Sequence, residues 1–79
     1  MVNTRRLTIA IDESGLKKQF LAEKLGLSIV TFWRKVKGES EFKLSEVVKL
    51  CELLKIRDVN ERDRIFFAKP VDYKSTYKE

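Results

Sequence analysis

Histidine is absent from this 79-residue sequence, and cysteine occurs once, at Cys51. A zinc site would therefore lack its nitrogen and sulfur ligand set, and no disulfide can form within the chain. The usual general base near neutral pH and the nucleophile triads that contain histidine are missing as well. The three glycines are dispersed, so there is no glycine-rich loop for phosphate groups. We expect a protein that is not an enzyme and that uses no metal, cofactor or small-molecule ligand.

Long hydrophobic runs are also missing. The apolar stretch from Leu7 to Ile11 is far shorter than the about 20 residues that cross a bilayer, and two acidic residues follow it in place of a small-residue cleavage site. We therefore expect no membrane segment and no export signal, which makes the cytoplasm the expected location. With 43% hydrophobic and 37% charged residues, the composition is typical of a soluble globule, and the length allows one domain.

Apolar residues recur at helical spacing, and the β-branched runs with turn pairs that are typical of hairpins are absent. The sequence therefore predicts an all-α fold of five short helices. The residues suited to capping helix starts are Asn3 or Thr4, Ser28 and Asp58, and those suited to ending helices are Gly15, Gly26 and Gly38.

The same spacing predicts which side of each helix faces the core. The expected inward residues are Leu7, Ala10 and Ile11 in the first helix, Phe20, Leu21 and Leu25 in the second, Phe32 and Val36 in the third, and Leu44, Val47, Val48, Cys51 and Leu54 in the fourth. In the fifth helix, Phe66 and Phe67 are adjacent and point about 100° apart. Either one is buried and the other lines a dimer or partner surface, or both are half buried.

A short turn between the second and third helices has a specific pattern. The run from Leu21 to Phe32, LAEKLGLSIVTF, resembles the helix-turn-helix of phage repressors and Cro proteins, with Ala22 and Gly26 where that family keeps an alanine and a glycine. The later segments GESEFKLSEVVKLCELL and RIFFAKPVDYKST are similar to those of small phage-encoded regulators in the same lambda repressor-like superfamily. The resemblance implies a compact five-helix bundle whose third helix enters the major groove, commonly with two copies on a palindromic operator.

The sequence departs from the pattern of this family at two lysines. Lys17 stands where a threonine or serine often caps the second helix, and Lys35 stands where an apolar core residue is usual. Either the third helix is rotated differently from that of the family, or Lys35 buries its aliphatic stem and directs its ammonium group outward. Residues 1–68 form the expected DNA-binding domain. Residues 69–79 offer little apolar surface and are expected to be a flexible tail, unless Tyr73 and Tyr77 dock it.

The net charge of +5 is confined to one half of the chain. Residues 1–38 contain eight basic and three acidic residues, a balance of +5, whereas residues 39–79 contain nine of each. The excess therefore lies with the helix-turn-helix, as a phosphate-binding surface requires. Several cations also lie in the first turn of a helix, where the helix dipole disfavours positive charge. A phosphate at these positions would bind both the free backbone amides and the cation.

The charge arguments, together with the family resemblance, which implies that Ser28 and Ile29 face the bases, give a set of candidate DNA contacts. The base contacts are expected from Ser28, Ile29, Val30 and Arg34, the phosphate contacts from Lys17, Lys18, Gln19, Lys37 and Lys43, and further contacts from Thr31, Trp33, Arg5 and Arg6. Arg34 can bond guanine O6 and N7 together, and Ile29 and Val30 can contact thymine methyl groups. The alternatives are a phosphate contact for Arg34, a place at the core edge for Trp33, and plain solvent exposure for Gln19.

Three functions are compatible with the sequence. The first is a sequence-specific transcriptional regulator of the Cro or repressor type. It would bind double-stranded operator DNA, and two copies of the chain could form a homodimer on it. The second is a protein-interaction module that binds and modulates a partner repressor. The third is non-specific nucleic-acid or RNA binding, although the exposed aromatic platform favoured by single strands is limited to Trp33. The cations at the helix starts favour the first.

Overall fold

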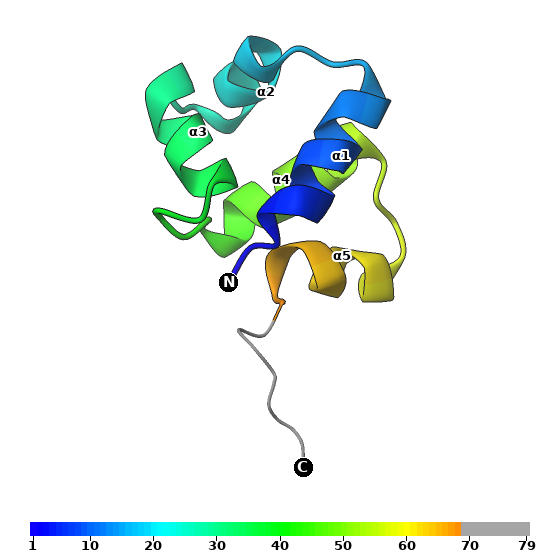
Figure 1. Cartoon of the computed structure of the whole chain (residues 1–79). Helices are drawn as coiled ribbons and strands as arrows, with labels where there is room; N and C mark the ends of the chain where they lie inside the picture. Colours follow the sequence, from blue (N-terminus) through cyan, green and yellow to red (C-terminus); the bar gives the residue numbers. More distant parts are fainter. Residues whose placement is uncertain (69–79) are drawn as a thin grey trace.

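Five α-helices make up residues 1–68, the part of the chain that the computed structural model describes (Figure 1). They are α1 (Thr4–Ser14), α2 (Lys18–Leu25), α3 (Ile29–Val36), α4 (Leu44–Leu54) and α5 (Val59–Phe66). No strand occurs in this range, so the predicted all-α class is confirmed. None of these helices is long and apolar enough to cross a membrane. The predicted flexible tail, residues 69–79, lies outside the described residues.

Side-chain caps explain where three of the helices begin. Asn3 Oδ1 accepts a hydrogen bond from the Arg6 amide at 3.1 Å, Ser28 Oγ accepts one from the Thr31 amide at 3.1 Å, and Asp58 Oδ1 accepts one from the Asn60 amide at 2.9 Å. Each bond satisfies one of the free amides at a helix start. The residues immediately before α2 and α4 are Lys17 and Lys43. A lysine side chain has no acceptor atom and cannot cap a helix in this way.

All five helices contribute to one core. Its buried hydrophobic residues are Leu7, Ile11, Leu21, Ala22, Phe32, Val36, Val47, Leu50, Cys51, Ile65 and Phe66. The Phe42 ring, in the loop before α4, packs edge-to-face on Phe32 and on Phe66, with ring centroids 6.4 and 5.7 Å apart. Such pairs add about 0.5–1.5 kcal/mol beyond the area that they bury. They connect α3, the loop and α5 through the centre of the domain.

The core side of two helices differs from the prediction. Leu44 and Val48 are 70% and 50% exposed, and Phe20 on α2 is also exposed, so their expected core positions were wrong. The buried side of α4 is instead formed by Glu46, Val47, Leu50 and Cys51. Apolar residues nearly encircle α4, so their spacing alone does not fix its rotation. The rotation observed brings Glu46 inward, which turns Leu44 and Val48 toward solvent.

The two adjacent phenylalanines of the fifth helix have different environments. Phe66 is 4% exposed and belongs to the core, whereas Phe67 is 46% exposed. The arrangement with one ring buried and one on the surface is therefore confirmed.

A backbone hydrogen bond joins the first and last helices. The Asn3 amide donates to the Ile65 carbonyl at 2.6 Å, which ties the start of α1 to α5. In Figure 1, α3 lies on one side of the molecule and α5 on another.

Candidate nucleic-acid interface

The turn between α2 and α3 forms as its glycine predicts. Gly26 has φ 73°, a left-handed conformation that residues with a β-carbon rarely adopt. Its amide donates to the Glu23 carbonyl at 3.0 Å, and the Leu27 amide donates to the Ala22 carbonyl at 2.9 Å. Two such bonds close the end of α2 and redirect the chain at once. Ala22 on α2 is buried, and α2 packs against α3 in the two-helix unit visible in Figure 1.

The start of α3 is fixed by a pair of hydroxyl residues. Besides accepting from the Thr31 amide, Ser28 Oγ donates to Thr31 Oγ1 at 2.9 Å. Thr31 keeps a hydroxyl hydrogen of its own, which it can donate to an acceptor outside the protein. Both residues lie at the helix end that the family resemblance places over the bases. Ser28 is exposed, and its neighbour Ile29 is 39% exposed.

One face of α3 lies outside the core. Val30, Arg34 and Lys37 are exposed on this side, while Phe32 and Val36 are completely buried on the other. The expected burial of Phe32 and Val36 on the core side of the third helix is therefore confirmed. A groove on the exposed side is lined by Val30, Trp33, Arg34, Lys37 and Glu39. The structure thus brings together four of the predicted contact residues, two of them cationic and one of them aromatic.

Glu39 is a member of this groove that the sequence prediction missed. Its amide donates to the Arg34 carbonyl at 2.8 Å, and the Gly38 amide donates to the Lys35 carbonyl at 3.1 Å. This pattern turns the chain back against the end of α3. The glycine before Glu39 is the signal that could have identified it, because a residue that follows such a glycine returns to the last helical turn.

Trp33 lies at the edge of the core and also carries cations on its ring. It is partly buried and packs against the core, and the Nζ atoms of Lys18 and Lys37 are 4.9 and 6.0 Å from its ring centroid. A cation over an indole face is attracted by the ring quadrupole. The two lysines come from the start of α2 and the end of α3. Trp33 therefore holds two expected phosphate contacts next to the exposed face of α3.

Other predicted cations lie at helix starts. Lys17 precedes α2, Lys43 precedes α4, and both are exposed. The first turns of α1 and α2 contain no acidic residue, whereas α5 has Glu61 in its first turn. Gln19, near the start of α2, is exposed. At the start of α4, by contrast, Glu46 lies in the first turn and accepts the Lys43 amide. The starts of α1 and α2 therefore leave positive charge beside free backbone amides.

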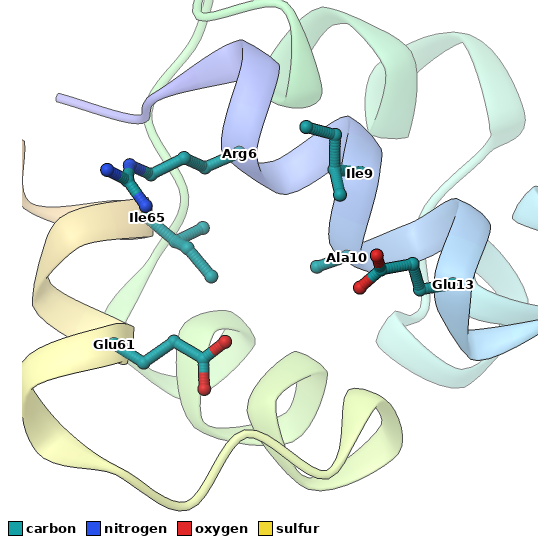
Figure 2. A pocket seen from close by; sticks show the side chains of 6 residues that line it. All are labelled: Arg6, Ile9, Ala10, Glu13, Glu61 and Ile65. Atoms are coloured by element: carbon teal, nitrogen blue, oxygen red, sulfur yellow. The ribbon is translucent and has the colours of Figure 1, made fainter.

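Arg6 lies apart from this surface. Its side chain lines a groove between α1 and α5, where Figure 2 shows it with Ile9, Ala10 and Glu13 of α1 and Glu61 and Ile65 of α5. The groove has a volume of about 140 Å³, below the about 300–1,000 Å³ of most small-molecule pockets. Arg5 is exposed on the same helix. The structure therefore does not bring Arg6 together with the residues of the α3 groove.

Lys35 differs from the expectation for its side chain. Its ammonium group is not directed outward: Lys35 is 8% exposed, and its Nζ lies 2.6 Å from Glu46 Oε1 on α4. The same carboxylate oxygen accepts a hydrogen bond from the Lys43 amide at 2.9 Å. Burial alone would raise the pKa of Glu46, but the hydrogen bonds from Lys35 and from the Lys43 amide outweigh it, so the pKa is lowered. The Glu46 side chain is therefore held in its carboxylate form.

A family model described as Cro/C1-type HTH DNA-binding domain matches residues 6–60. The matched range contains α2, the turn and α3, together with α4 and most of α1. No curated protein and no solved structure shows a significant match. The match therefore covers the helices that form the groove and those that support it.

Proposed function

Because the chain belongs to the Cro/C1-type helix-turn-helix DNA-binding domain family, we propose that it is a transcription regulator that binds operator DNA with α3 in the major groove. One observation carries this proposal: the side of α3 formed by Val30, Arg34 and Lys37 faces solvent immediately after the turn. An α-helix with such a free side fits the about 12 Å width of the major groove. The opposite side of α3 is held rigidly in the core.

Arg34 is the main base-reading residue in this proposal. Its exposed guanidinium can donate two parallel bonds to guanine O6 and N7, worth about 1–3 kcal/mol of discrimination. Val30, one helical turn earlier, is 57% exposed and can contact a thymine methyl group, as can Ile29. Ser28 and Thr31 add hydroxyl groups at the helix start. We expect half-sites in which a guanine is flanked by thymines.

The phosphate contacts come from the surrounding cations. Lys18 and Lys37 are held on the Trp33 ring, Lys17 stands beside the free amides that begin α2, and Lys43 is exposed immediately before α4. A phosphate group at a free helix start would be attracted by the lysine and would accept hydrogen bonds from the backbone amides. Gln19 can add a neutral hydrogen bond. These contacts fix the position of the domain on the duplex, while α3 supplies the sequence preference.

Regulation in this proposal follows from occupying the operator. Two copies of the chain bind a palindromic site of the kind that Cro proteins and phage repressors use, with half-sites about 34–36 Å apart or a multiple of that distance. A bound pair excludes polymerase from an overlapping promoter and so represses it. The phage type of regulator and the dimer are both parts of the proposal, and an enriched palindrome tests the dimer.

The experiment is selection of binding sites from random duplexes by the full chain, repeated at two salt concentrations. An enriched palindrome with the expected guanine supports the proposal. Salt-sensitive binding without enrichment would point to non-specific nucleic-acid binding instead. Absence of binding to any duplex would overturn the proposal and favour a module that binds a partner repressor.

A further inference from the structure

The buried pair Lys35–Glu46 lies directly behind the exposed face of α3. Lys35 follows Arg34 in the sequence, yet its side chain points inward and is only 8% exposed, as is Glu46. Within residues 1–68 this is the ion pair that joins α3 to α4, because the other pair, Arg62–Asp63, lies within α5. By contrast, α3 packs chiefly against α2 and α1. The pair therefore provides a direct, charged link from the DNA-facing helix to α4.

A single carboxylate oxygen connects two parts of the proposed interface. Glu46 Oε1 accepts from Lys35 Nζ at 2.6 Å and from the Lys43 amide at 2.9 Å. Lys35 belongs to the helix that carries Arg34, and Lys43 is the expected phosphate contact before α4. Hydrogen bonds depend on direction, whereas apolar packing does not. The two bonds can therefore fix the rotation of α3 relative to the start of α4 more strictly than Phe32 and Val36 can.

Stability is a poor explanation for such a pair. Removing two charges from water is costly, and apolar residues of similar volume often replace a buried ion pair without loss of stability. The pair is therefore not needed to fill this part of the core, and its directional bonds remain as its distinguishing property.

We propose that Glu46 is a positioning residue for DNA recognition: it sets the relation between Arg34 on α3 and Lys43 before α4 without touching DNA. The inference rests on the proposed function. Glu46 then keeps Arg34 and Lys43 at a fixed distance from each other. The base contact of Arg34 and the phosphate contact of Lys43 can therefore form together on the operator. Loss of the pair lowers operator affinity more than affinity for unrelated duplexes, because only on the operator must Arg34 and Lys43 bind at the same time in the correct relative position.

The test compares wild-type protein with the double variant Lys35→Met and Glu46→Leu, which replaces the pair by apolar side chains of similar size. We expect a folded variant whose urea midpoint is not lowered and whose operator affinity falls at least about tenfold, with affinity for unrelated duplexes changed less than about threefold. Unchanged operator affinity would overturn the inference. The matched control, Arg62→Gln with Asp63→Asn, removes the partly exposed pair of α5 and is expected to bind the operator like wild type.

A second variant covers the case in which the double variant does not fold. Glu46→Asp keeps the charge that Lys35 needs, but its side chain is one methylene shorter and cannot reach both partners. We expect faster hydrogen exchange at the Lys43 amide and a reduced ratio of operator to non-specific affinity. An unchanged ratio would overturn the inference. Failure of wild-type protein to bind any duplex would instead overturn the proposed function, and this inference with it.

Discussion

The ammonium nitrogen of Lys18, at the start of α2, lies 4.9 Å from the ring centroid of Trp33 on α3. The contact crosses the turn of the helix-turn-helix and joins the residue expected to bind phosphate to the helix expected to read bases. Trp33 also lines the groove that holds Arg34. One aromatic side chain therefore connects the core, the charged rim and the exposed face of α3.

Replacement of Lys18 by alanine tests its role as a phosphate contact. We expect weaker binding to all duplexes and a decrease of about 1 in the slope of log affinity against log salt concentration, because one fewer phosphate is neutralised. The slope is measured by titration at several salt concentrations. Arg64→Ala, which removes an exposed cation from α5, is the control and is expected to leave the slope unchanged. A Lys18→Ala slope equal to that of wild type would contradict the assignment.

Trp33 is the only tryptophan, so intrinsic fluorescence reports on the groove directly. Because two lysines that are expected to bind phosphate lie over its ring, DNA binding should change their positions and the emission of the indole. We expect an emission change that saturates together with operator binding and disappears at high salt concentration. Constant emission at saturating operator would show that Trp33 is remote from the DNA.

Substitution of Gly26 by alanine tests the backbone of the turn. An added β-carbon would meet no atom within 4 Å, so the expected effect arises from the left-handed conformation alone. We expect a loss of about 1–2 kcal/mol in the free energy of unfolding, measured by urea titration. Gly15→Ala, with the same φ and the same open space, should lose a similar amount. A Gly26→Ala protein as stable as wild type would mean that the turn adopts another conformation.

The buried carboxylate predicts a pH dependence of stability. Because the pKa of Glu46 is lowered by folding, its contribution is complete above its ordinary pKa of 4.5 and is lost as the pH falls through the lower value of the folded state. Glu46→Gln removes this contribution. The stability difference between wild type and Glu46→Gln should therefore be constant above pH 4.5 and shrink on further acidification. Urea titrations at several pH values would measure it, and a difference that grows in acid would refute the pairing.

Much of the fold follows from local features of the sequence. Asn3, Ser28 and Asp58 cap the helices that they were predicted to begin, because a cap needs only a side-chain oxygen and an amide two or three residues on. The exposed side of α3 was also predictable. Its buried Phe32 and Val36 are four residues apart on one side, and Val30 and Arg34 are four apart on the other, so the helix has one consistent orientation.

The rotation of α4 could not be predicted in the same way. Leu44 and Val48 are as apolar as the buried Val47 and Leu50, so the sequence offers more than one inward face. Contact between Lys35 and Glu46, eleven residues apart, accompanies the face that is used. A prediction from the spacing of apolar residues places the charged Glu46 on the exposed side of the helix. Lys35 alone does not reveal which acidic residue will pair with it.

The central claim is that Arg34 reads a base rather than a phosphate, and one measurement tests it directly. Wild type and Arg34→Ala are titrated against the selected operator and a set of variants that each change one base pair. We expect Arg34→Ala to lose about 1–3 kcal/mol of binding free energy on the operator and to lose discrimination at the guanine position, while it keeps its preferences elsewhere. An equal loss on every variant, with discrimination at the guanine intact, would show that Arg34 contacts only the backbone and would contradict the account.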